Sequence, residues 1–376
     1  MFELLTSAWH ALTGVLGPHG PAVNAAKSYV PGDFSIHIFT CRVVGWLGKK
    51  LLHQPQVVGE MIAGVILGPS LFGLLLPDLQ LTVFPKETRN VLYVGAQLGV
   101  GLYMFIVGLT LNLDHFKSKA RSAAMVSGAG IAAPFLFAVL ITPFPWTVPG
   151  LFAPGIDRAS ATLFMGACIA LTAFPMLARI INERGLANSS LGTLSLTAGA
   201  FDDAASWCVL AIVLATFGAG AGVAVLAIGG AVLYTAFMLG FGRRLLAPLG
   251  RIVERECAMS SEMLAMAMLL FCLSAFVMDA IGIHAIFGGF LMGVCMPRGL
   301  FVEELKRKVE PLAVVLLLPM FFTYSGLNTR LDMVNSATLL VIALGILIVS
   351  ILAKFGACYA AARLSGQDNR TALGIG

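Results

Sequence analysis

Two adjacent aspartates, Asp202 and Asp203, lie in the middle of an apolar stretch that runs from Leu194 to Leu214. A helix of that length can cross the hydrocarbon core of a bilayer. A charged side chain at that depth costs at least about 2.5 kcal/mol, so acids inside membranes usually mark ion or proton pathways. Consecutive residues point about 100° apart on a helix, so the two carboxyl groups can face different partners. The pair therefore predicts an ion or proton pathway; a structural pair neutralised by a basic residue is the alternative.

A second polar feature, the segment from Ala170 to Arg179, indicates an interrupted helix at a similar depth. Pro175 has no N–H to donate to the carbonyl of Leu171, so the helix should break or kink there. Thr172 adds a hydroxyl beside the break. Broken helices expose carbonyl groups and half-helix ends that coordinate ions in transporters. A simple proline kink is the alternative.

Lys354 is the only lysine that lies well inside an apolar stretch. A buried ammonium needs an anion, and one of the two aspartates is the obvious candidate. Snorkelling toward the interface is the alternative, but the lysine lies about nine residues from the end of its span, which is deep for that.

The composition shows what must position these residues. The chain has 376 residues, of which 58% are hydrophobic and 11% charged, whereas soluble domains carry about 25% charged residues. This indicates a polytopic membrane protein. The net charge of +5 is spread over short loops and gives no reason to expect a nucleic-acid partner. The seven cysteines show no metal-ligand or disulfide spacing, and no motif calls for a cofactor.

Apolar runs separated by Gly, Pro or charged loops predict eleven membrane spans. Loops after odd-numbered spans hold 17 of the 24 Lys and Arg residues, and loops after even-numbered spans hold four. The positive-inside rule then places the N-terminus outside a cell (inner) membrane. The predicted spans cover 34–52, 56–77, 91–112, 120–144, 159–183, 189–217, 221–247, 258–278, 283–297, 310–327 and 335–362.

Two passages recur with opposite orientation. The pattern GLxxxLD occupies 108–114 at the end of span 3 and 326–332 at the end of span 10. A GxxxG motif followed by proline occupies 64–69 in span 2 and 289–297 in span 9. Seven spans separate each pair, and an odd offset inverts the second copy, as in the inverted repeats of secondary transporters. If spans 1–6 repeat as 8–13, the fold needs thirteen spans, of which this chain holds eleven.

Several of these segments, in this order, resemble monovalent cation/proton antiporters. The resemblance is closest to the branch with bacterial Na⁺/H⁺ antiporters, Kef-type potassium transporters and plant cation/H⁺ exchangers, and it runs from about residue 34 to the last residue. The segments that carry it are QPQVVGEMIAGVILGPSLFG (54–73), LTAFPMLARIINERGL (171–186), FDDAASW (201–207), LPMFFTYSGLNTRLD (318–332) and AKFGACYAAARLSG (353–366).

The resemblance implies roles for these residues. Asp203 would bind a cation or a proton in competition, and Asp202 would pair with Lys354. Thr172 would lie in the first of two broken helices that cross at the ion site, and the second would follow residue 376. The family forms homodimers in which a core moves against a dimerisation part like an elevator. An Asp-Asp pair with a lysine resembles the site of the electrogenic members of this family, which move net charge across the membrane.

The resemblance also divides the chain by function. Spans 1, 2, 8 and 9 would serve dimerisation, spans 3–6, 10 and 11 the transport core, and span 7 would link them. The divisions are an N-terminal lead at 1–33, spans 1–3 at 34–112, spans 4–6 at 113–217, span 7 at 218–247, spans 8–9 at 248–299 and spans 10–11 at 300–376.

The sequence thus predicts an all-α membrane protein with an inverted-repeat antiporter fold, which exchanges Na⁺ or K⁺ for protons and is not an enzyme. Two alternative interpretations of the function stay open. An intramembrane aspartate enzyme would need a second acidic motif on another span or loop. A naturally short chain could be non-transporting or dependent on a partner.

Overall fold

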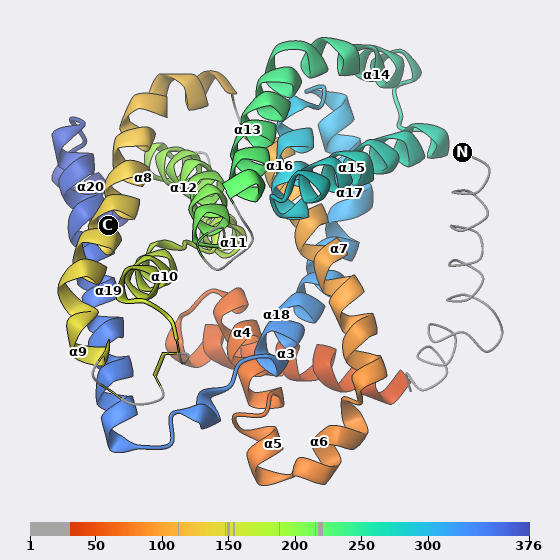
Figure 1. The fold of residues 1–376 in the computed structure, drawn as a ribbon. Coiled ribbons are helices and arrows are strands. Elements are labelled where there is room, and N and C mark those ends of the chain that lie inside the picture. The colour runs from red at the N-terminus through yellow and green to blue at the C-terminus, as the bar shows by residue number, and fades with distance from the viewer. Residues whose placement is uncertain are drawn as a thin grey trace. The chain divides into compact units, whose positions relative to one another are not determined.

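The computed structural model describes residues 31–111, 113–146, 148, 151–152, 155–187, 189–214, 216 and 221–376. The lead predicted over 1–33 falls almost wholly outside these ranges. Helices are the only regular secondary structure that the described residues form (Figure 1). In chain order they are α3 (Pro31–Leu52), α4 (Gln56–Leu67), α5 (Phe72–Leu75), α6 (Pro77–Val83), α7 (Lys86–Thr110), α8 (Leu113–Ile141), α9 (Pro143–Trp146), α10 (Arg158–Ala170), α11 (Phe174–Glu183), α12 (Ser190–Leu214), α13 (Ala221–Phe237), η2 (Met238–Gly242), α14 (Arg243–Glu256), α15 (Ser261–Ile281), α16 (Ala285–Cys295), α17 (Leu300–Leu312), η3 (Ala313–Leu317), α18 (Leu318–Leu327), η4 (Leu331–Met333), α19 (Ala337–Leu364) and α20 (Asn369–Ile375).

Each of the eleven predicted spans coincides with a described helix or helix pair. Nine stretches within the described residues are long and apolar enough to cross a membrane. The first predicted span, α3, is not among the nine, and α16 is apolar but only 11 residues long. The all-helical membrane fold is therefore confirmed, and the count of eleven spans stays a prediction.

The chain divides into two compact units. One comprises Met1–Tyr103 and Val309–Val334, and the other comprises Met104–Lys308 and Asn335–Gly376. Helices α7 and α17 each contribute residues to both units. The functional division predicted from the sequence stays a prediction.

In the first unit, α4 and α18 approach each other at glycines. A Cβ atom added to Gly64 would overlap the carbonyl of Phe322, and one added to Gly326 would overlap the backbone of Gly64. The hydroxyl of Ser70, just beyond α4, donates to the carbonyl of Thr329 at 2.8 Å and accepts from the backbone N–H of Leu331 at 3.0 Å. The GxxxG motif of span 2 thus packs against the GLxxxLD motif of span 10.

The second unit repeats this contact with the motifs exchanged. A Cβ atom added to Gly108 of α7 would overlap the carbonyl of Phe290, and one added to Gly293 of α16 would overlap the carbonyl of Phe105. The Arg298 guanidinium, just beyond α16, donates to the carbonyls of Leu109 and, at 3.4 Å, Gly108. An inverted repeat that exchanges span 2 with span 9 and span 3 with span 10 requires this pair of matching contacts.

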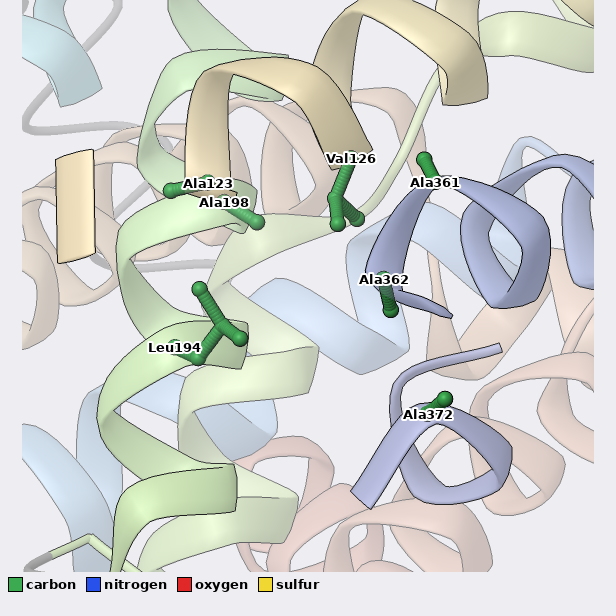
Figure 2. Packing of buried hydrophobic residues seen from close by; sticks show 7 residues of the cluster. All are labelled: Ala123, Val126, Leu194, Ala198, Ala361, Ala362 and Ala372. Atoms are coloured by element: carbon green, nitrogen blue, oxygen red, sulfur yellow. The ribbon is translucent and has the colours of Figure 1, made fainter. Parts of the chain in front are cut away.

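Small side chains let the helices around the aspartates pack closely. Figure 2 shows a buried cluster drawn from α8, α12, α19 and α20, in which five of seven side chains are alanines. Small residues bring helix backbones together, which is how helices in membranes gain packing energy. This packing brings Lys354 of α19 within reach of α12. The cluster consists of Ala123, Val126, Leu194, Ala198, Ala361, Ala362 and Ala372.

Candidate ion-binding site

The helix predicted to break at Pro175 is interrupted. Helix α10 ends at Ala170, Leu171 has ψ 125°, and α11 begins at Phe174 with proline in its first turn. The backbone N–H of Phe174 donates to the carbonyl of Thr172 at 2.9 Å rather than to that of Ala170, four residues earlier. Proline suits the first turn of a helix because its missing N–H would have no partner there. The interruption frees the carbonyl of Ala170, which a simple kink would not do.

The start of α10 is fixed by Asp157. Its carboxylate accepts the backbone N–H groups of Ala159 and Ser160, each at 2.9 Å, and the hydroxyl of Ser160 at 2.6 Å. These hydrogen bonds, first of all that of the Ser160 hydroxyl, hold the pKa of Asp157 below its ordinary value. Such a cap satisfies the free N–H groups at a helix start and anchors the half-helix that carries Ala170.

Lys354 reaches the interruption from α19. Its ammonium group donates to the carbonyl of Ala170, to the hydroxyl of Thr172 and, at 3.1 Å, to Oδ2 of Asp202. The lysine side chain is 24% exposed and that of Asp202 is 8% exposed, so the ion pair is largely shielded from water. The structure thus shows the expected contact of Lys354 with Asp202 and adds Thr172 to it.

Asp203 lies on a different side of α12 from this ion pair. It is buried, with 7% of its surface exposed, and the described residues give it no hydrogen-bond donor. One turn before it, a Cβ atom added to Gly199 would press on Leu177 and Phe174 of α11. One turn after it, the ring of Trp207 contacts that of His284 at a tilt of 36°, with ring centroids 4.8 Å apart. Asp203 is therefore a carboxyl group without a cationic partner beside a broken helix.

Ser206 is a further polar residue that the sequence reading missed. Its hydroxyl is buried and has no partner among the described residues, and the same holds for Oδ1 of Asp202, one turn earlier. Helical hydroxyls usually bond the carbonyl four residues back, as Thr197 does at 2.7 Å. The i, i+4 spacing from Asp202 was the available signal. A serine hydroxyl is common in such helices, so the spacing alone did not select it.

The charges at this site are unequal. When both carboxyl groups are ionised, the single ammonium leaves one negative charge, which can attract one monovalent cation or one proton. The donors are carboxylate, hydroxyl and carbonyl oxygens, the groups that coordinate Na⁺ and K⁺ in transporters and channels. The described residues hold no group of three or more His, Cys, Asp and Glu that could bind a resident metal. The oxygen donors and the negative charge suit a small monovalent cation.

Comparison with known proteins identifies the family. The family described as "Sodium/hydrogen exchanger, transmembrane" matches residues 38–376. The chain belongs to this family. Antiporter relatives include the Na⁺/H⁺ antiporter NhaS4 of Synechocystis, 36% identical over 89% of this chain and 82% of that protein. The K⁺/H⁺ antiporter 1 of Saccharomyces cerevisiae is 31% identical over 76% of this chain and 34% of that protein.

A solved antiporter structure shares the fold. The sodium/proton antiporter MjNhaP1 of Methanocaldococcus jannaschii aligns with a TM-score of 0.62 and 16% sequence identity. The alignment covers 94% of this chain and 81% of that one. This likeness confirms the antiporter fold, and the family match confirms the resemblance seen in the sequence. The chain spans only about a third of the longer yeast relative.

Proposed function

We propose that the chain exchanges Na⁺ or K⁺ for protons across the cell membrane by alternating access. The contact of Lys354 with Asp202, Thr172 and the Ala170 carbonyl carries this proposal, because Asp203 is then left without a cation beside a broken helix. The Na⁺/H⁺ and K⁺/H⁺ antiporters among the relatives support this substrate class. The site requires no covalent step, and we assign the chain no enzymatic activity.

In the proposed cycle, Asp203 binds a proton on one side of the membrane and a cation on the other. Because both compete for one carboxyl group, the proton must leave before the cation binds. The freed Ala170 carbonyl and the Thr172 hydroxyl are oxygen ligands near the same helix break. Pro175 keeps the break open by starting the second half-helix.

Lys354 sets the charge that crosses the membrane. If the ion pair of Lys354 and Asp202 breaks during the cycle and a proton is bound in its place, more protons than cations cross the membrane in each turnover. Transport is then electrogenic. Each net charge then gains or loses about 2.3 kcal/mol per 100 mV of membrane potential. Transport would follow the elevator mechanism in a homodimer. Each chain of the homodimer would lie in the bilayer with its N-terminus outside the cell. The division into a transport core and dimerisation spans belongs to the same proposal.

The decisive experiment measures proton flux into proteoliposomes that contain the full chain, after Na⁺, K⁺ or Li⁺ is added outside. Asp203→Asn keeps the size of the side chain and removes the competition, so flux should fall to the level of empty vesicles. Asp332→Asn is the matched control, because Asp332 is an acid that pairs with Arg330 outside the site. Cation-dependent flux that is unchanged in Asp203→Asn would refute the proposal.

A further inference from the structure

An apolar cavity lies against α12, the helix that carries the two aspartates. It has a volume of about 690 Å³ and is lined by α12, α13 and α16 within one compact unit. Representative lining residues are Ala204, Cys208, Val232, Leu239, Phe287 and Phe290. Its volume lies within the range of about 300–1,000 Å³ typical of ligand pockets, and its walls are almost entirely hydrocarbon. An occupant must therefore be mostly apolar.

A second cavity of about 740 Å³ adjoins the first and is strongly basic. The two share Leu239 and Arg243 in their linings. Arg244, Arg251 and Arg298 also line the basic cavity, with Glu254 as its single acid. Four positive charges against one negative charge make this end attractive to an anion.

The arginines of the basic cavity keep their positive charge available. Arg243, Arg244 and Arg251 form no ion pair with any described residue. Arg298 donates its hydrogen bonds to backbone carbonyls. Because carbonyls carry no net charge, the positive charge of Arg298 is not neutralised. The four arginines line one cavity, so like charges are held close together there, and burial and, next, the neighbouring Arg243 lower the pKa of Arg298. A phosphate group would relieve that repulsion, and arginine binds phosphate through paired hydrogen bonds.

Helix α14 gives the same end of the unit an amphipathic surface. It carries arginines at 243, 244, 251 and 255, while Leu246 and Val253 are buried. Leu245 and Ile252 are exposed large apolar side chains on the same helix. A basic helix with exposed apolar side chains is typical of a segment that lies in the headgroup region of a membrane. The basic cavity is therefore at headgroup depth, and the apolar cavity extends from it toward the hydrocarbon core.

We propose that the two joined cavities bind one acidic phospholipid, with its phosphate among the arginines and an acyl chain between α12, α13 and α16. The lipid is the occupant that matches both ends, since a free phosphate leaves the apolar cavity empty and a neutral lipid leaves the arginines unpaired. Bound there, the acyl chain contacts residues on α12 within one turn of Asp203.

Photolabelling of the full chain tests the assignment. The protein is reconstituted in phosphatidylcholine vesicles with a minor fraction of phosphatidylglycerol, and either lipid carries a photoreactive group near the end of one acyl chain. Phosphatidylglycerol should label peptides of α13 and α16 at least about fivefold more than phosphatidylcholine, since even one arginine near the surface adds about fivefold in affinity. Equal labelling by the two lipids, or labelling confined to other helices, would overturn the proposal.

Charge variants separate this site from general attraction of acidic lipids. The preference should disappear in the triple variant Arg243→Gln, Arg244→Gln, Arg251→Gln. It should persist in a control that removes three exposed charges elsewhere, Lys49→Gln, Lys308→Gln, Arg370→Gln. A preference that survives the first variant, or is lost equally in the second, contradicts a specific site.

Two further arms keep the proposal testable if the triple variant fails to fold. Ala236→Phe fills the apolar cavity while keeping every arginine, and labelling of α13 and α16 by phosphatidylglycerol should then fall several-fold. Unchanged labelling in this variant would overturn the proposal. Soluble glycerol 3-phosphate should compete poorly; competition as effective as that of the lipid would mean that the site binds phosphate alone.

Discussion

Removal of the buried ammonium group of Lys354 should destabilise the protein. Lys354→Met keeps the apolar stem and leaves the Asp202 carboxylate, which now lies 3.1 Å from Nζ, without its cation. At an effective dielectric constant of about 20, the attraction across that distance is about 5 kcal/mol before desolvation is counted. Breaking a buried pair by removing one partner costs about 3–5 kcal/mol. The loss of stability in Lys354→Met should therefore be about 3–4 kcal/mol.

The measurement is thermal unfolding of purified Lys354→Met and of the unchanged protein at neutral pH. Lys354→Arg keeps the charge and is the matched control, with a smaller loss. A Lys354→Met loss no larger than that of Lys354→Arg would refute the ion pair as the source of the stability. Lys354→Met should also weaken the dependence of transport on membrane potential; full voltage dependence would refute the role of the pair in electrogenic exchange.

Three other changes test the site and the fold. Thr172→Val removes one oxygen ligand and keeps the shape of the side chain, so the cation concentration for half-maximal flux should rise about 5–10-fold, whereas Thr172→Ser should restore it. Ser206→Ala removes the buried hydroxyl one turn from Asp202 and should shift the pH profile of transport without changing thermal stability by more than about 1 kcal/mol; an unchanged profile would exclude a role for this hydroxyl. Gly326→Ala should destabilise by about 1–3 kcal/mol because its Cβ would meet the backbone of Gly64, while Gly345→Ala, which meets open space, should be neutral or stabilising in thermal unfolding.

Hydropathy located most helices because the cost of exposing polar groups to lipid acts on each segment separately. The predicted span 258–278 corresponds to α15 at Ser261–Ile281, for example. The helix of the tenth span begins at Leu300, ten residues before the predicted span at 310–327. The first helical turns of that stretch carry Glu303, Glu304 and several basic residues, and a hydropathy scan cannot separate a charged helix from a loop. The helical stretch after span 7 likewise continues through α14 to Glu256.

The sequence alone determined the polytopic membrane class, the inverted motifs and the presence of two costly acids in hydrocarbon, and it predicted a break or a kink at Pro175. These features follow from local chemistry: a missing N–H, the transfer cost of a charge, and the spacing of glycines. Only the tertiary structure decided that the Ala170 carbonyl and the Thr172 hydroxyl join the expected pair of Lys354 and Asp202, and that Asp203 has no part in that contact. Those contacts depend on which helix faces pack together, and alanine-lined helices that look alike in sequence can pack in many ways.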